Sequence, residues 1–392
     1  MPGTLAGTPV ELRAYPAESR TNARFREFDL RRLDVVYLPE SLWPLADGES
    51  TPAGAFVEDD NRGAVSRAPV ATIDGAPFYL SVKGIGSSVE PFSSRTLDRT
   101  AAAELTDDPD LLERLRRPPP DRDPRLITGE LWLRGSPYGG QGEEHAATAL
   151  RISERADLTS IEGFQIAPVV KVCALPSALA DRLRRLYWYR QYRGRMVQEL
   201  RLVPSNVRIY FHARQTIGSG VGAVFDQFGV ASPAAAIAFE TNFVRTAVPM
   251  LTLFARTLAP APGGDRFTGL DFHDVWLDKD AVVAPDGRIF FVDLEGVDDV
   301  TVDRAEVREK VEDQIYRSLY EFVFAFEQIE AERARRFGGA GDRRDHFARI
   351  VAEALRDDPY VRLRSDAGRW EMVVRNRCAE ENLYVAFRLI DR

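Results

Sequence analysis

Two acidic residues flank a predicted β-hairpin in the second half of the chain. The runs Ala281–Ala284 and Arg288–Val292 are largely apolar and are separated by a Pro-Asp-Gly turn, which predicts two short strands. Asp280 precedes the first strand and Asp293 follows the second, so the hairpin would bring both carboxylates to one end. Carboxylate oxygens are ligands with which proteins hold Mg²⁺ on phosphate groups. The sequence therefore predicts that Asp280 and Asp293 bind a metal ion.

A lysine and a glutamate could complete a site for phosphoryl or nucleotidyl transfer. Such chemistry needs a cation on the triphosphate and a carboxylate that orients this cation. Lys83 ends the predicted strand Phe78–Lys83 and suits the first role, and the small-residue segment Gly84–Gly86 follows it. Glu143 lies in the first turn of the next predicted helix and suits the second role. The alternatives left open are a surface position for Lys83 and a helix-dipole role for Glu143.

The elements that must position these residues divide into a strand-rich part and a helix-rich part. Short apolar runs between turn signals predict strands, and apolar residues at helical spacing predict helices. Besides those above, the predicted strands are Val35–Leu38, Ala53–Glu58, Ala68–Ile73, Phe164–Cys173 and Glu199–Val203, and the predicted helices are Glu143–Ala156, Ser177–Gln198, Pro233–Leu258 with a kink at Pro249, Val302–Arg336 and Asp342–Asp357. We therefore expect an α+β fold with two lobes.

The expected domain boundaries follow from this division. Residues 1–50 are an N-terminal lead-in, residues 51–210 form a strand-rich, nucleotide-binding N-lobe, and residues 211–392 form a helical C-lobe that carries the metal-binding hairpin. Residues 95–128 are charged and contain a run of three prolines, so we interpret them as a surface insertion in the N-lobe.

The composition is that of a folded chain. Its 392 residues carry a net charge of −8, which argues against a nucleic-acid or anionic-membrane surface. No apolar run reaches the roughly 18 residues that a transmembrane helix needs, and two cysteines are too few for a disulfide scaffold. We expect a cytoplasmic protein. Only four of the 52 basic residues are lysines, which draws attention to Lys83 and Lys279.

Three segments of the chain together resemble one known family. Residues 78–93, FYLSVKGIGSSVEPFS, are similar to a family segment in which a strand ends in Lys-Gly-x-Gly. Residues 199–215, ELRLVPSNVRIYFHARQ, are similar to a segment that contains two arginines seven residues apart. Residues 273–280, HDVWLDKD, and the later VDLEG are similar to the segments around its metal ligands. In this order they resemble the selenoprotein O family, protein adenylyltransferases with a kinase-like fold.

The resemblance implies a two-lobed, protein-kinase-like fold in which the N-lobe contacts the nucleotide. Lys83 would contact phosphate, together with Gly84 and Gly86 of the segment that follows it. Glu143 would pair with Lys83, and Glu144 is the alternative because the helix register is open by one residue.

The resemblance also implies the cofactors and the reaction. Arg201 and Arg208 would bind the triphosphate of ATP, and Asp280 and Asp293 would hold Mg²⁺ or Mn²⁺. ATP would lie in the reverse sense to that in ordinary kinases, which exposes its α-phosphate. The protein would then be an enzyme, a nucleotidyltransferase that transfers AMP to hydroxyl groups of a protein substrate.

One departure from the family lies next to the metal position. The family has an Asp-Asn pair where this chain has Lys279-Asp280. Asp280 can still bind Mg²⁺, but Lys279 stands where the family has its general base. Asp278 or Asp274 would replace that base, or Lys279 would neutralise developing charge. Val275 stands where an ordinary kinase keeps its catalytic aspartate. The alternatives are therefore a nucleotide-binding pseudokinase that acts through a partner protein, or a phosphotransferase that uses the γ-phosphate.

Overall fold

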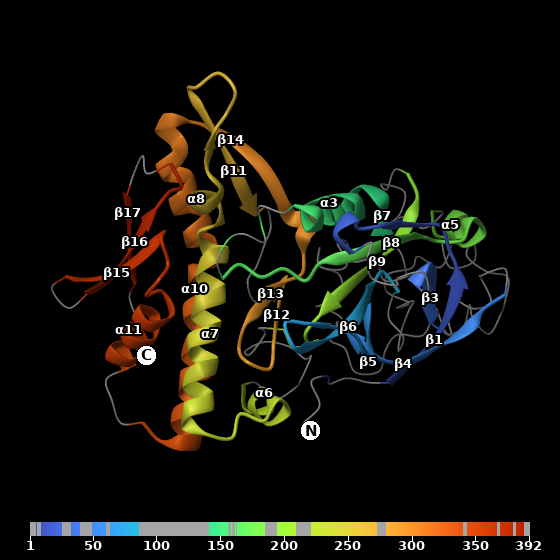
Figure 1. Cartoon of the computed structure of the whole chain (residues 1–392), viewed down its shortest axis with the longest axis horizontal. Coiled ribbons are helices and arrows are strands. Elements are labelled where there is room, and N and C mark those ends of the chain that lie inside the picture. The colour runs from blue at the N-terminus through green and yellow to red at the C-terminus, as the bar shows by residue number, and fades with distance from the viewer. Residues whose placement is uncertain are drawn as a thin grey trace, which may run out of the picture. The chain divides into compact units, whose positions relative to one another are not determined.

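In the computed structural model, the chain forms two compact units (Figure 1). The structure describes residues 5, 9–25, 33–39, 49–59, 63–85, 141–155, 158, 161, 163–184, 194–208, 221–272, 280–339, 343–366, 369–378 and 382–387. The strand-rich unit comprises Leu5–Glu154 and Pro168–Val203, and the helical unit comprises Met1–Thr4, Arg155–Ala167 and Pro204–Arg392. Both units contain helices and strands, which confirms the expected α+β class.

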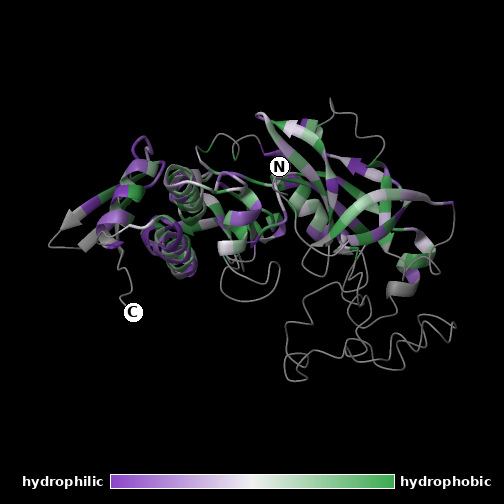
Figure 2. Ribbon diagram, turned by 90° about the horizontal axis from the view of Figure 1, so that it is seen from below, coloured by the Kyte–Doolittle hydropathy of each residue, from purple (hydrophilic) through white to green (hydrophobic). Residues whose placement is uncertain are grey.

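A nine-stranded antiparallel sheet forms the core of the strand-rich unit. Its strands are β1 (Pro9–Pro16), β2 (Ser19–Thr21), β3 (Val35–Pro39), β4 (Thr51–Asp59), β5 (Gly63–Ile73), β6 (Ala76–Lys83), β7 (Gln141–Gly142), β8 (Val169–Ala174) and β9 (Met196–Val203). They follow the order β2-β8-β9-β6-β5-β4-β1-β3, and β7 also pairs with β9. Many of their residues are hydrophobic, shown green in Figure 2. β9 is buried along its whole length and lies within this core.

The consecutive strands β4, β5 and β6 confirm three strands predicted from the sequence. β5 and β6 are joined by a turn at Asp74 and Gly75, whose φ angles are 50° and 77°. Two consecutive residues with positive φ are typical of a type I′ hairpin turn, whose twist matches that of the flanking strands. This turn starts the β5–β6 pairing, which ends with Lys83 opposite Gly63.

The N-terminal strands are part of the same sheet. β1 pairs with β3 and β4, and β2 pairs with β8. Residues 5–50 therefore belong to the strand-rich unit, although the sequence indicated a separate lead-in. The division between the units also differs from the expected boundary at residue 210, because residues 155–167 and all residues from 204 onward belong to the helical unit. Pairing between distant segments, which local patterns do not reveal, determines this division.

Two described helices belong to the strand-rich unit, α3 (Glu143–Glu154) and α5 (Ser177–Arg184). α3 confirms the predicted helix at this position and packs on β8 and β9. The predicted helix 177–198 is wrong at its end, because residues 196–198 belong to β9, and residues 185–193 lie outside the described residues. Gly194 has a φ of 79°, which interrupts a helix. The run after it is buried on both faces, and periodicity alone cannot tell such a strand from a buried helix.

The described helices of the helical unit are α6 (Val221–Phe228), α7 (Pro233–Leu251), α8 (Leu253–Thr257), α10 (Val307–Phe337) and α11 (Arg343–Ala354). α7 begins after Ser232, whose side chain accepts a hydrogen bond from the Ala235 amide. The break between α7 and α8 follows Pro249 closely and confirms the predicted kink. Both α10 and α11 pack on α7. Phe243 of α7 stacks on Phe322 of α10 with 5.9 Å between the ring centroids.

Three small sheets complete the helical unit. They consist of β10 (Ala259–Pro260), β11 (Arg266–Phe272) and β14 (Val297–Asp303), of the hairpin β12 (Ala281–Val283) and β13 (Ile289–Phe291), and of β15 (Val361–Asp366), β16 (Arg369–Arg375) and β17 (Asn382–Phe387). The hairpin confirms the two strands predicted around the Pro-Asp-Gly turn. The sequence did not predict β11 and β14, and β14 corrects the expected start of a helix at Val302, because this strand extends to Asp303. They pair from Arg266 with Asp303 to Phe272 with Val297, which joins segments that no local pattern connects.

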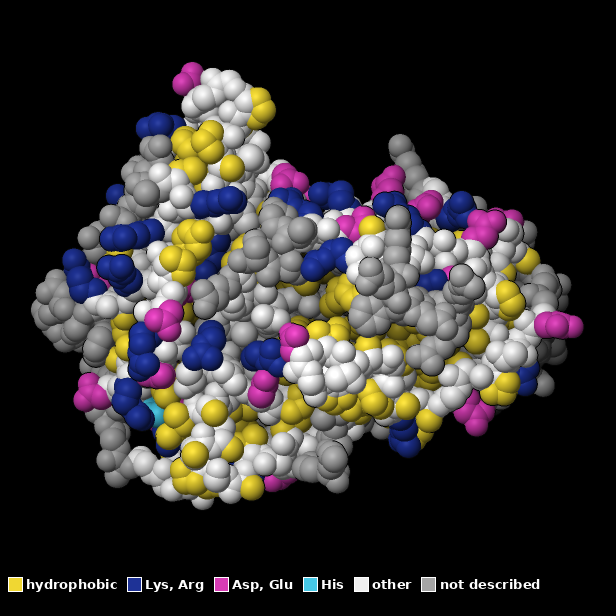
Figure 3. All heavy atoms as spheres, in the orientation of Figure 1, with side chains coloured by type: hydrophobic (Ala, Val, Ile, Leu, Met, Phe, Trp, Pro, Cys, Tyr) yellow, Lys and Arg dark blue, Asp and Glu magenta, His cyan; other side chains and the backbone are white. Residues whose placement is uncertain are grey.

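The outer surface of the helical unit is mixed in character. On the face shown in Figure 3, basic and acidic side chains both lie over this unit, with hydrophobic side chains among them. None of the described helices alone is long and apolar enough to cross a membrane, and α6 with α7 meet that test only as a pair bent by 112°.

Gly287 closes the turn of the β12–β13 hairpin and allows a close contact with α7. Its φ is 90°, and a Cβ added to it would lie 2.4 Å from the backbone oxygen of Phe239. We expect Gly287→Ala to lower the free energy of unfolding by about 2–4 kcal/mol, because alanine meets both left-handed strain and overlap with the backbone. Gly263→Ala is the matched control, since Gly263 has a φ of 110° but no atom within 4 Å of an added Cβ. Equal losses for the two variants in urea denaturation would contradict this account.

Candidate functional site

The end of β6 places Lys83 directly opposite Glu199 of β9. In the antiparallel register, Lys83 pairs with Glu199 and Ser81 pairs with Arg201. Opposite residues in such a pair have Cβ atoms about 4.5–5.5 Å apart on one face, and residues two apart on a strand share that face. Lys83, Glu199 and Arg201 therefore lie on the same face of the sheet. The structure brings two predicted site residues together with a glutamate that the sequence pattern did not single out.

Glu199 and Arg201 form a buried ion pair. Their side chains are 0% and 4% exposed. The Arg201 Nε donates to Oε1 of Glu199 at 2.9 Å, and Nη2 donates to Oε2 at 3.3 Å. A charge-assisted contact at two points fixes both side chains, so the guanidinium predicted to bind the triphosphate is held by Glu199. The sequence signal that could have found Glu199 is the Glu-Leu-Arg alternation, which places both charges on one face of a strand.

Glu143, the first residue of α3, contacts Arg195 just before β9. Its amide donates to the Arg195 carbonyl at 3.0 Å, and its Oε2 accepts a hydrogen bond from the Arg195 amide at 3.3 Å. Arg195 precedes Glu199 by four residues, a distance of about 13 Å along a strand. The register therefore does not place Glu143 beside Lys83 as the resemblance implied, and Glu199 occupies that position. Glu144, the alternative, is exposed on α3.

Gly84 follows Lys83 in a conformation that suits glycine. Its φ is 94°. Its carbonyl accepts a hydrogen bond from Nε2 of Gln198 at 3.2 Å, which fixes the turn after β6. Gly86, the second predicted glycine, lies outside the described residues, so its role stays a prediction.

The hairpin of the helical unit brings Asp280 and Asp293 to one end, as its sequence predicts. Ala281 pairs with Phe291, and the Val292 amide donates to the Asp280 carbonyl at 2.8 Å. Asp280 therefore lies opposite Val292, and Asp293 is the next residue in the chain. Asp280 is buried and Asp293 is half-buried. Two carboxylates thus belong to one largely covered end of the hairpin.

Arg208 lies on the segment next to this hairpin. It forms an isolated antiparallel bridge with Val282 of β12, two residues after Asp280. Arg201 belongs to the strand-rich unit and Arg208 to the helical unit. The two arginines that the resemblance assigns to one triphosphate therefore lie in different units.

The donor set at the hairpin fits an oxygen-liganded cation. Mg²⁺ keeps several waters and commonly takes one or two protein carboxylates together with substrate phosphates. In the part of the chain that the structure describes, no group of three or more His, Cys, Asp or Glu residues could hold a metal ion. Asp278 and Lys279, the predicted catalytic residues, lie outside that part, and their roles stay predictions. Asp280 and Asp293 would thus suit Mg²⁺ or Mn²⁺ on a phosphate.

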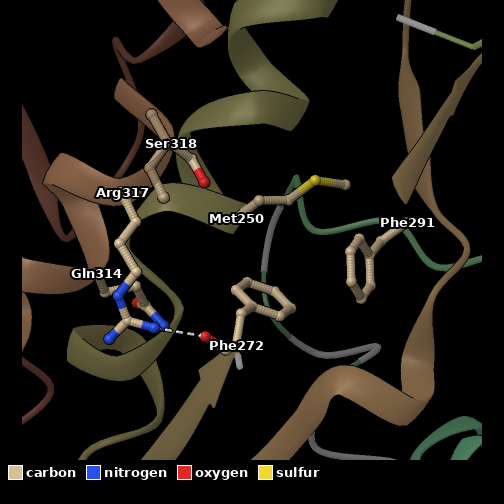
Figure 4. A pocket seen from close by; sticks show the side chains of 7 residues that line it. Met250, Phe272, Phe291, Gln314, Arg317 and Ser318 are labelled. Carbon is tan, nitrogen blue, oxygen red and sulfur yellow. Dashed lines mark hydrogen bonds between the residues drawn. The ribbon is translucent and has the colours of Figure 1, made fainter. Parts of the chain in front are cut away.

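α10 fixes the end of β11, the strand that precedes residues 273–279. Asp271 near the end of β11 is fully buried and forms ion pairs with Lys310 and Arg317 of α10. Arg317 Nη1 also donates to the Phe272 carbonyl at 2.6 Å (Figure 4). Two cations of one helix therefore hold the strand end at which the predicted catalytic segment begins.

A small pocket lies beside this anchor (Figure 4). The rings of Phe272 and Phe291 form part of its wall, with their centroids 4.7 Å apart. Its full lining is Met250, Leu251, Phe272, Phe291, Gln314, Arg317 and Ser318. The enclosed space holds about one water molecule. The pocket is therefore too small to be a nucleotide site by itself.

Two lysines, Lys171 and Lys310, form ion pairs that hold the fold together. Lys171 of β8 is buried and forms an ion pair with Asp34. Lys310 is held in the ion pair with Asp271 described above. The rarity of lysine therefore does not mark catalytic positions by itself, and the role proposed for Lys83 depends on its place at the end of β6.

Neither described cysteine takes part in a disulfide. Burial raises the pKa of the Cys173 thiol to about 12, and this effect outweighs the opposite effect of nearby Lys171. The Cys173 thiol donates to the Leu33 carbonyl at 3.4 Å. A fully buried thiol with a raised pKa is typical of a packing residue.

Comparison of the chain with models of protein families and with curated proteins finds no match. The resemblance to the selenoprotein O family therefore stays a prediction that depends on three sequence segments.

Proposed function

We propose that this protein binds ATP with Mg²⁺ and transfers AMP to hydroxyl groups of a protein. The observation that carries the proposal is the β12–β13 hairpin, which has Asp280 and Asp293 at one end. Kinase-like folds use acidic residues in such positions for metal ions that bridge the phosphates. The order of elements supports the proposal. Lys83 ends the third of the consecutive strands β4, β5 and β6, and α3 is the next described helix, like the phosphate-binding lysine and the following helix of kinases.

Within this proposal, each basic residue has a distinct role. Lys83 contacts the triphosphate as a compact ammonium group, and Glu199 orients it from the opposite strand. Arg201 holds Glu199 in place through their two-point contact. Arg208, beside the hairpin, binds a phosphate oxygen. Arg201 is therefore a positioning residue in this proposal. Lys83 is the phosphate ligand of the strand-rich unit, and Arg208 is the phosphate ligand of the helical unit.

The proposed reaction is a displacement at the α-phosphorus of ATP. The acceptor hydroxyl oxygen forms a bond to this phosphorus, the bond from phosphorus to the bridging oxygen of the β-phosphate breaks, and pyrophosphate leaves. The hydroxyl proton passes to a base, for which Asp274 and Asp278 are the candidates. Lys279 neutralises charge that develops on the phosphates, and Mg²⁺ supplies the same stabilisation when bound.

Particular residues favour two alternative functions, a nucleotide-binding pseudokinase and a phosphotransferase. Lys279 stands where the resembled family has an acid, and a chain without that acid could bind nucleotide as a pseudokinase that acts through a partner protein. Asp280 and Asp293 would also serve an ordinary phosphotransferase, because transfer of the γ-phosphate needs the same metal ligands.

Calorimetric titration of the full chain with Mg·ATP tests the proposal. We expect binding that weakens about 10-fold when Lys83 is replaced by methionine, because the ammonium contact is lost. Binding together with transfer to an added protein supports the proposal. Tight binding without transfer would favour the pseudokinase, and absence of binding would contradict every nucleotide-dependent function.

A further inference from the structure

Gln198 is a fully buried amide side chain in β9. Its Nε2 donates to the Tyr37 carbonyl at 2.7 Å, and its Oε1 accepts a hydrogen bond from the Tyr37 amide at 2.8 Å. Nε2 also donates to the Gly84 carbonyl at 3.2 Å. All three residues belong to the strand-rich unit. The single amide therefore links β9 to β3 and to the turn that follows Lys83.

The first two hydrogen bonds cover an edge of the sheet. β3 is the last strand in the sheet order, and an end strand has a row of backbone groups that no neighbouring strand pairs. The Gln198 amide offers Tyr37 one acceptor and one donor, as a neighbouring strand would. The Tyr37 ring packs on Phe56 of β4 with centroids 5.4 Å apart, which holds β3 in place.

The third hydrogen bond fixes the peptide that follows Lys83. Because a peptide unit is planar and trans, the carbonyl of Gly84 and the amide of Ile85 point in opposite directions. A Gly84 carbonyl held toward Gln198 therefore directs the Ile85 amide away from it. The positive φ of Gly84, 94°, makes this arrangement accessible to glycine without strain.

We propose that Gln198 is a positioning residue that sets the Lys83–Gly84 turn for the phosphates of a nucleoside triphosphate. Through this amide, the N-terminal strand β3 supports the turn, so residues outside the nucleotide site contribute to nucleotide affinity. This inference rests on the proposed function, in which Lys83 contacts the triphosphate. The sequence indicated β3 only as part of a lead-in. In this inference, β3 supports the turn that contacts the phosphates.

The test compares Gln198→Met with Ser66→Ala in the full chain. Methionine keeps the length of the side chain and removes all three hydrogen bonds. Ser66 is the matched control, because its buried hydroxyl donates to the Ala68 carbonyl at 2.8 Å and accepts from the Leu80 amide at 2.9 Å in the same sheet. Residue-resolved hydrogen exchange and calorimetric titration with Mg·ATP are measured on both variants and on the wild type.

We expect Gln198→Met to speed exchange at Tyr37 and in residues 83–85 by about 10-fold and to weaken Mg·ATP binding by about 10-fold. Ser66→Ala is expected to leave both quantities within about 2-fold of wild type, even where its melting temperature falls equally. Gly84→Ala acts on the turn directly. It is expected to weaken Mg·ATP binding without changing exchange at Tyr37.

Distinct results separate a failure of this inference from a failure of the proposed function. Faster exchange at Tyr37 alone, with unchanged exchange at residues 83–85 and unchanged affinity, would show that Gln198 only covers β3 and would overturn the inference. A wild-type chain that does not bind Mg·ATP would overturn the proposed function, and the inference with it.

Discussion

Replacing Glu199 with alanine is expected to lower the free energy of unfolding by about 3–5 kcal/mol. Glu199 is fully buried and is held by two contacts from Arg201. Its removal leaves a guanidinium charge in the core of the strand-rich unit without this counter-charge, and such a charge is far less stable there than in water. Urea denaturation, followed by fluorescence and by circular dichroism, measures the loss.

Two further variants make this prediction specific. The double replacement of Glu199 by leucine and Arg201 by methionine is expected to recover most of the loss, because both charges leave the core together. Glu371→Ala breaks a more exposed pair with Arg364, whose side chains are 20% and 50% exposed, and is expected to cost less than about 1 kcal/mol. If Glu199→Ala lowered the free energy of unfolding by a similarly small amount, the Glu199–Arg201 ion pair would not stabilise the core as we expect.

Replacing Asp293 with asparagine is expected to reduce Mg²⁺-dependent AMP transfer by at least about 100-fold. Asparagine keeps the size of the side chain and removes the charge that a divalent cation needs. Asp293 is half-buried and lies just outside the hairpin, whose last backbone hydrogen bond joins Val292 to Asp280. We therefore expect the hairpin to keep its fold in this variant. Transfer is measured with labelled ATP at several Mg²⁺ and Mn²⁺ concentrations, and a partial rescue by more metal is expected.

Asp286→Asn is the matched control, because Asp286 lies in the turn at the other end of the same hairpin and pairs with the neighbouring Arg288. It is expected to change transfer by less than about 3-fold, as surface substitutions usually do. Equal activity of Asp293→Asn and wild type would remove the metal site from the proposal. Equal loss in both variants would indicate that the hairpin acts only through its stability.

Features defined within a few residues of sequence were predictable. The Pro-Asp-Gly turn between two apolar runs is enough to predict the β12–β13 hairpin, and the proline at position 249 is enough to predict the break after α7. Asp74-Gly75 likewise marks the turn between β5 and β6, where both residues have positive φ. In each case the physical cause, a fixed or left-handed backbone conformation, lies in the residues themselves.

Features that depend on pairing between distant segments were not predictable. The neighbour of Lys83 is Glu199 because β6 pairs with β9, and no local pattern predicts the register of that pairing. The resemblance indicated Glu143 instead, whose carboxylate accepts a hydrogen bond from the Arg195 amide. β1, β11 and β14 escaped prediction for the same reason, because their partners lie in other parts of the chain.

The most direct test of the account is label transfer from ATP that carries the label at either the α- or the γ-phosphate. Full-length chain, Mg²⁺ and candidate acceptor proteins are incubated with each nucleotide, and the proteins are separated under denaturing conditions. We expect protein-bound label from α-labelled ATP alone, an equal amount of released pyrophosphate, and loss of both with Asp293→Asn. Protein-bound label from γ-labelled ATP alone would contradict this expectation.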